Sequence, residues 1–202
     1  MGGAWQAAFI IGAMLLQRIQ QQFIDSADLG YQCAEALGAQ VEAAISAVQA
    51  VVTGGGKVWV HGVGAGAALA PLFVAQFVGT YDRDRPGLPA VQLPADAPVR
   101  SLAALATADD LLLLIGAQGG AAVAAAQPLV DAAHERDMPV VVLGALGNGL
   151  LTHGLRDTDV NVCVPHTRAA RITEMHLLVL NCVCDGVDAL LLGDAAEMEM
   201  AA

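Results

Sequence analysis

Apolar residues recur at helical spacing over the first quarter of the chain. Two separate runs show spacings of three to five residues: Leu15, Ile19 and Phe23, and then Ala36, Val41, Ile45, Val48 and Val52. Such spacing gathers side chains on one face of an α-helix. The pattern predicts two N-terminal helices, the first of them opening at Met14. Residues 1–13 have no partner in the pattern, so we interpret them as an apolar tail or a misassigned start before a single domain over residues 14–202.

Short Val- and Leu-rich runs alternate with helical segments after the glycines 54–56, which predict a helix end. We expect strands at residues 57–61, 90–93, 111–115, 139–143 and 160–164. One helix is expected to follow the first strand and to end near Val78, and two more are expected over residues 120–136 and 169–192. Uninterrupted apolar strands are typical of parallel sheets covered on both faces. The predicted fold is therefore α/β, a three-layer sandwich with a five-stranded parallel sheet flanked by helices.

Two glycine-rich loops follow the first and third predicted strands. Ligands of parallel sheets bind at the carboxyl ends of the strands, and helix N-termini offer free N–H groups to an anion. Among the side chains of both loops, only Gln118 carries a hydrogen-bond donor. We expect degenerate ligand loops built mostly from backbone groups, with these residues: Gly62, Gly64, Gly66, Gly116, Gln118, Gly119 and Gly120.

Charge and composition exclude some classes of function. The net charge of −11, with only 9 Lys and Arg, opposes direct nucleic-acid binding, which needs clustered cations. Hydrophobic residues make up 56% of the chain and aromatic residues 4%, a core of Ala, Val and Leu that suits an oligomer. The uncharged stretches 58–81 and 111–130 are about long enough to span a membrane. Their glycine clusters favour a strand, a turn and a helix instead, and with no basic n-region the expected location is cytoplasmic.

Several single residues invite a functional interpretation. His61 ends a strand beside the first loop, where ligand sensing and a structural hydrogen bond are both open. Arg171, near the start of the last helix, gains nothing from the helix dipole and needs a specific partner. Glu174 and His176 on the same helix face an interface or form a structural pair. These four residues are the candidate pocket.

Further charged, apolar and cysteine residues allow both a structural and a functional interpretation. Arg83 and Arg85 alternate with aspartates, which predicts a solvated turn. Leu191 and Leu192 end the last helix before an acidic tail, so they form either a partner-binding patch or the edge of the core. The four cysteines lack the spacing of a metal or redox site and are expected to be buried and reduced.

Three stretches carry a resemblance that covers nearly all of the chain from Met14 onward. They are Gly55-Gly56-Lys57-Val58, Arg85-Pro86-Gly87-Leu88-Pro89-Ala90, and residues 164–176. Together they resemble the SIS (sugar isomerase) family, in the branch that holds phosphoheptose isomerase and the DnaA initiator-associating protein. Asn181-Cys182-Val183-Cys184-Asp185 is similar to the initiator-associating protein and differs from the isomerase.

The departures from the isomerase pattern concern its chemistry. The resemblance places a loop Asn on Val63, a loop Ser on Gly66 and further hydroxyls on residues 116–121. It places the zinc and acid/base groups of the isomerase on four residues that cannot support such chemistry: Leu72, Gln76, Thr173 and Asn181. We therefore expect no catalytic residue, no metal and no cofactor. The segment 93–109 is also shorter than is usual for the family, which implies the loss of a helix beside the site.

An estimate of magnitude bears on phosphosugar binding. Hydrogen bonds to a charged group contribute about 1.5 to 3 kcal/mol each, so losing three or four hydroxyls costs on the order of 6 kcal/mol. That is roughly four decades of affinity. We expect weak phosphosugar binding at most, and a non-catalytic homotetramer that regulates a replication initiator protein, the tetramer being implied by the resemblance. The alternatives are a sedoheptulose 7-phosphate isomerase or a phosphosugar-binding protein with a degenerate site.

Overall fold

A single parallel sheet forms the centre of the computed structural model, which describes residues 2–117, 120–146 and 154–193. Its strand order is β2-β1-β3-β4-β5, and every neighbouring pair is parallel. The predicted five-stranded parallel sheet is confirmed. The strands are β1 (Val58–Gly62), β2 (Ala90–Gln92), β3 (Leu111–Ala117), β4 (Val140–Ala145) and β5 (Val160–Val164).

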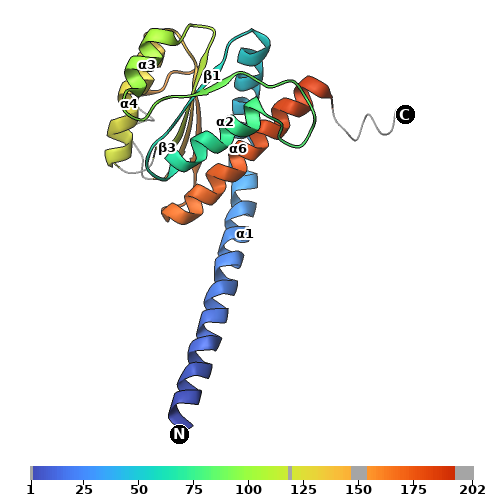
Figure 1. Cartoon of the computed structure of the whole chain (residues 1–202), viewed down its shortest axis with the longest axis vertical. Helices are drawn as coiled ribbons and strands as arrows, with labels where there is room; N and C mark the ends of the chain where they lie inside the picture. The colour runs from blue at the N-terminus through green and yellow to red at the C-terminus, as the bar shows by residue number, and fades with distance from the viewer. Residues whose placement is uncertain (1, 118–119, 147–153, 194–202) are drawn as a thin grey trace, which may run out of the picture.

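Helices cover both faces of the sheet (Figure 1). One face carries α1 (Gly2–Thr53), α2 (Leu69–Val78) and α6 (Ala169–Leu192), and the other carries α3 (Pro98–Leu105) and α4 (Gly120–His134). Side chains of a strand alternate between the faces, so Val58 and Val60 pack under α1, α2 and α6 while Trp59 packs under α3 and α4. The stretch 58–81 is a strand, a short 3₁₀ turn and a helix, and the described residues of 111–130 are strand and helix, in agreement with the prediction.

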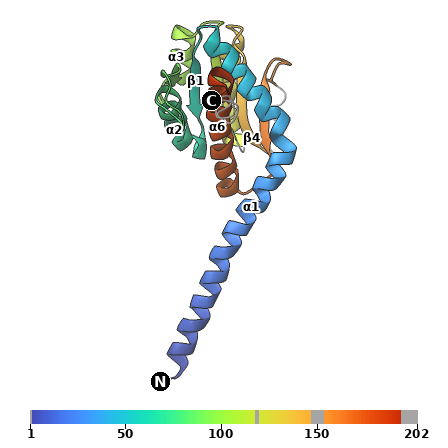
Figure 2. The ribbon, with the colours of Figure 1, turned by 90° about the vertical axis from the view of Figure 1, so that its right-hand side faces the viewer.

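The N-terminal region differs from the prediction in one respect. The two predicted helices are a single helix, α1, which also includes residues 2–13. Leu29 and Cys33 are buried between the two apolar runs and join them into one stripe. Gly30 lies inside this helix, and a Cβ built on it would meet no atom within 4 Å. The C-terminal half of α1 packs on the sheet and the other helices, which together form the body of the molecule. Its N-terminal, outer half projects far beyond this body (Figure 2).

Two smaller features also differ from expectation. The short segment after β2 still holds a helix, α3, which begins at Pro98, a favourable residue for the first helical turn. All four cysteines are free thiols, but only Cys33 and Cys184 are buried as predicted, since Cys163 is half-buried and Cys182 is exposed. Because Cys184 is buried two residues further along α6, the two thiols lie on different faces of that helix.

By length and composition, α1 (from Met14) and α6 are apolar enough to span a membrane. The most apolar window of α6 is 44% buried, because α6 packs against α1 and the sheet, so its composition is that of a core helix. The corresponding window of α1 is only 17% buried. Of these two helices, α1 therefore leaves more of its apolar surface uncovered, including Leu15, Ile19 and Phe23.

Candidate functional site

The two glycine loops lie side by side at the carboxyl ends of the strands, as predicted. The first loop leads from β1 through the 3₁₀ helix η1 (Gly64–Ala68) into α2, and the second leads from β3 to α4. Gly62 is in register with Ile115, and the amide of Val63 donates a hydrogen bond of 2.9 Å to the Ile115 carbonyl. The loops are therefore joined to each other through their backbones.

This contact leaves no room for a side chain at three of the loop glycines, Gly62, Gly66 and Gly116. A Cβ atom on Gly66 would overlap the backbone of Ile115, and one on Gly116 would lie 2.6 Å from the Val63 carbonyl oxygen. Gly116 also has a φ of 82°, which strains any other residue. Gly62 is equally close to the backbone of Gly66. In this arrangement the serine that the family resemblance places on Gly66 cannot be accommodated. Gln118 and Gly119 lie outside the described residues.

Two other glycines and one valine complete the loops. Gly64 has a φ of 56° and no atom within 4 Å of a built Cβ, so it occupies an open turn, and Gly120 begins α4. Val63, at the position where the resemblance places an Asn, is buried in the layer under α3 and α4. Its apolar side chain supplies no hydrogen bond to a ligand.

The four positions matched to the zinc and acid/base groups do not fit a zinc ion. Leu72 is exposed, and the Thr173 hydroxyl donates to the Ala169 carbonyl at 3.0 Å. The side-chain oxygens of Gln76 and Asn181 are buried without a partner among the described residues. Zinc sites use thiolate, imidazole or carboxylate ligands, and this set has none. Within the described part of the chain, no group of three or more His, Cys, Asp or Glu could hold a metal ion.

The two candidate histidines lie on opposite faces of the sheet. His61 alternates with Val60 on β1 and so belongs to the face under α3 and α4, where partial burial lowers the pKa of its imidazole. His176 lies on α6, and its Nε2 is 2.9 Å from the carbonyl oxygen of Gly144. Burial lowers the pKa of His176 more than this hydrogen bond raises it. A neutral His176 therefore donates to Gly144, a structural role.

Arg171 and Glu174 come together at a small cavity of about 200 Å³ between α1 and α6. Arg171 Nη2 is 2.7 Å from Glu174 Oε1, and Nη1 donates to the Gln22 carbonyl at 2.8 Å. The Ser26 hydroxyl donates to Glu174 Oε2 at 2.7 Å, and Phe23 completes the lining. These bonds tie the first turns of α6 to α1. The structure thus separates this pair from both histidines, and its partners on α1 carried no signal in the sequence.

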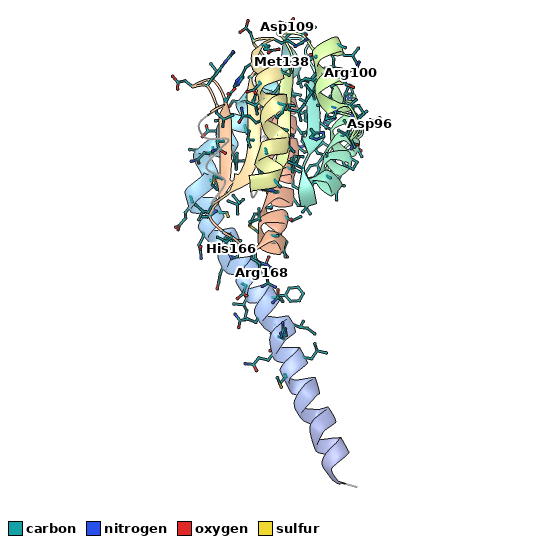
Figure 3. The ribbon with its side chains drawn as sticks, turned by 90° about the vertical axis from the view of Figure 1, so that its left-hand side faces the viewer. Asp96, Arg100, Asp109, Met138, His166 and Arg168 are labelled. Carbon is teal, nitrogen blue, oxygen red and sulfur yellow. The ribbon has the colours of Figure 1, made fainter. Side chains whose placement is uncertain are left out.

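Figure 3 shows His166 and Arg168 at the end of the body from which α1 projects. Arg168 donates to Gln22 Oε1 at 3.1 Å, so it adds to the same junction. This end of the body holds the carboxyl ends of the strands. Because α6 begins here and runs back along the sheet, its last turn lies at the opposite end (Figure 1).

The last turn of α6 exposes two leucines. Leu190 is 58% exposed and Leu192 is 39% exposed, whereas Leu191 packs against the core cluster. The two predicted residues therefore differ: Leu192 is accessible to a partner, while Leu191 packs in the core. Leu190 and Leu192 are two residues apart, so they lie on opposite sides of the core-facing Leu191, and Leu190 is the more accessible of the two.

The predicted solvated turn is wrong for Arg85. Its side chain is buried, pairs with Asp188 of α6, and donates to the carbonyls of Phe77 and Gly79 at 3.0 and 3.1 Å. The alternation of Asp and Arg in residues 82–85 suggested exposure. The better signal was that Arg85 opens one of the stretches that carry the family resemblance.

The chain is similar to known proteins that agree with the resemblance seen in the sequence, although no family model matches it. The phosphoheptose isomerase of Methylibium petroleiphilum is 43% identical over 196 residues, covering 90% of this chain and 97% of the relative. The DnaA initiator-associating protein DiaA of Klebsiella pneumoniae is 35% identical over 190 residues, covering 86% of this chain and 95% of the relative. The solved structure of phosphoheptose isomerase GmhA from Neisseria gonorrhoeae has a TM-score of 0.77 at 30% identity, covering 87% of this chain and 99% of that one.

Proposed function

The chain belongs to the SIS family, in the branch of phosphoheptose isomerases and DnaA initiator-associating proteins, and within it we propose a non-catalytic oligomer that binds and regulates a DnaA-type replication initiator. The observation that carries the proposal is the backbone contact between the glycine loops at Gly66 and Gly116. It occupies the space that side-chain donors for a phosphosugar would need.

Aldose–ketose isomerisation moves a proton between neighbouring carbons and needs an acid or base within hydrogen-bond reach of them. The matched positions hold Leu, Gln, Thr and Asn, none of which titrates near neutral pH. Neither candidate histidine replaces them, because His176 is bonded to Gly144 and His61 lies on the far face of the sheet from α2 and α6. This arrangement supports a role without catalysis.

Protein binding is supported by a second set of observations. Two relatives at 35% identity, from Klebsiella pneumoniae and Serratia proteamaculans, are DnaA initiator-associating proteins. Leu190 and Leu192 offer exposed apolar surface at one end of the body. An oligomer that repeats this surface would gather several initiator molecules through effective concentration.

We further propose that the oligomer is a homotetramer assembled through α1 and α6. Leu15, Ile19 and Phe23 are spaced four residues apart and precede the part of the stripe that is buried at Leu29 and Cys33. Phe23 is 75% exposed. Within one described chain, nothing covers this part of the stripe, and a second copy offers the same kind of surface that α1 already packs on.

Phosphoheptose isomerase activity is the second candidate, favoured by the 43% identity to the Methylibium protein of that name. The two candidates separate in one assay: turnover of sedoheptulose 7-phosphate, with the Methylibium protein as a positive control and with zinc measured by elemental analysis. We expect no turnover above the buffer blank and no stoichiometric zinc. Turnover at a rate comparable to the control would replace the proposed function with the isomerase.

Two further parts of the proposal concern ligand and location. Backbone N–H groups at the glycine loops still permit weak binding of a phosphosugar, far below the affinity of a site with hydroxyls. We place the protein in the cytoplasm, where a replication initiator acts on DNA. The proposal needs only the domain of residues 14–202, and residues 2–13 extend α1 beyond it.

A further inference from the structure

Two arginines of one short segment hold the end of α6. The buried guanidinium of Arg85 contacts Asp188 through Nε, and both side chains are only 2% exposed. Arg83, two residues earlier, donates to the carbonyl of Gly193, the residue that follows the helix. The segment before β2 thus contacts α6 at two points within its last two turns.

Arg85 also joins this helix end to a second helix. Its Nη1 donates to the carbonyls of Phe77, Gly79 and Pro86, and its Nη2 donates to that of Gln76. The last carbonyls of a helix lack partners within the helix and favour a cation. One planar guanidinium therefore fixes the end of α2 and the end of α6 together, which a Lys ammonium cannot do with the same geometry.

Helix ends without such contacts fray, and their side chains have no fixed direction. Leu190 and Leu192 lie within one turn after Asp188, so their orientation depends on this contact. Asp188 Oδ2 is buried without another partner among the described residues. Arg85 is thus the described group that neutralises the Asp188 carboxylate and keeps it in place.

We propose that Arg85 is a positioning residue for the partner-binding surface: through Asp188 it holds Leu190 and Leu192 in the orientation that the initiator requires. This inference rests on the proposed function. The chemistry of the surface further defines the partner. Asp82, Asp84 and Asp185 are exposed beside this helix end, so the surface fits apolar side chains surrounded by Lys and Arg.

The test uses the full chain and the purified initiator. Arg85→Lys keeps the charge but loses the fork of donors, and Arg156→Lys is the matched control in an exposed pair with Asp137. Affinity is measured well below the melting temperature of each variant, so that all molecules are folded. We expect Arg85→Lys to weaken binding about tenfold or more, equivalent to about 1.4 kcal/mol. Arg156→Lys should bind like the wild type.

Two additional readouts separate positioning from general stability. Hydrogen exchange should accelerate in residues 186–193 of Arg85→Lys while β3 and β4 keep their protection. Leu192→Ser introduced into the wild-type chain should weaken initiator binding. Introduced into Arg85→Lys, it should weaken binding little further, since both changes act on one surface.

The outcomes distinguish two failures. If the initiator does not bind the wild type, the proposed function fails and this inference fails with it. If the initiator binds the wild type and folded Arg85→Lys equally well, only the positioning role of Arg85 is overturned. Independent, additive effects of Arg85→Lys and Leu192→Ser would also overturn it, because the arginine would then not act through the leucine.

Discussion

The two ends of the body differ in what satisfies their loop and helix-end backbone groups. At the carboxyl ends of the strands, the glycine loops pack backbone against backbone, and Gly66 and Gly116 have no space for a side chain. At the other end, the terminal carbonyls of α2 are bonded by the long side chain of Arg85, and the end of α6 displays Leu190 and Leu192. At one end the contact between the loops excludes side chains at Gly66 and Gly116, and at the other end side chains form the exposed surface.

The difference has a functional consequence. A phosphate-binding loop needs open N–H groups and nearby side-chain donors, and the contact between the loops leaves no space for side-chain donors at Gly66 and Gly116. A protein-binding surface needs fixed, exposed apolar groups, and the end of α6 has them. The comparison therefore supports the proposal that a partner protein binds at the end of the body that lies away from the strand ends.

Assembly should show the largest effect. Replacing Ile19 and Phe23 by Asp places charge in the uncovered stripe of α1, so we expect the proposed tetramer to dissociate to smaller species. Light scattering at micromolar concentration measures this change. Tyr31→Asp is the matched control, because Tyr31 is equally exposed but lies two residues from both Leu29 and Cys33, away from the stripe. An unchanged mass for the double variant would contradict assembly through α1.

The loop contact predicts the next largest effect. Gly66→Ser must displace the backbone of Ile115 or of its own loop, and we expect a loss of about 3 kcal/mol in the free energy of unfolding. Ala65→Ser, at the exposed neighbouring position, should change it by no more than about 0.5 kcal/mol. Urea denaturation compares the two variants. If Gly66→Ser is as stable as the wild type, the loops are more open than this structure has them.

The three terminal leucines of α6 should separate into two kinds. Leu191→Ser exposes a gap in the core and should cost about 2 kcal/mol of stability. Leu190→Ser and Leu192→Ser should each cost about 0.5 kcal/mol or less while weakening initiator binding. Melting temperatures and affinities measured on the same samples check this prediction. A loss of binding confined to Leu191→Ser would reverse our assignment of the surface.

The smallest effect concerns pH at the strand ends. Burial holds the pKa of His176 below its ordinary value, so below a pH of about 6.5 the unfolded chain takes up a proton that the folded chain does not. Stability is thus complete above this pH and falls as the pH is lowered, by at most about 1.4 kcal/mol per pH unit for one group. His176→Gln keeps a donor for Gly144 and should flatten the dependence. An identical pH profile for the variant would exclude His176 as its source.

Much of the fold was predictable from the sequence. Continuous apolar strands and their alternation with helices gave the parallel sheet, and the glycines after β1 and β3 gave the position of the loops, because these features depend on local pattern. The continuity of α1 was not predictable in this way. Leu29 and Cys33 become part of the stripe only when the helix is already continuous, and the apolar spacing alone did not show this.

The site was predictable in composition and not in arrangement. The sequence shows that Gly66 and Gly116 lack hydroxyls, but only the fold reveals that their Cα atoms lie against another backbone. The role of Arg85 depends on Asp188, which is 103 residues away in the chain. Local charge alternation predicted exposure there because it contains no information about a distant partner.

Binding of the purified replication initiator to the wild-type chain and to the Leu190→Ser, Leu192→Ser double variant tests the central claim most directly. The account predicts saturable binding to the wild-type tetramer and at least about tenfold weaker binding to a variant of unchanged mass and melting temperature. Absence of binding to the wild type, or equal affinity for both, would contradict it.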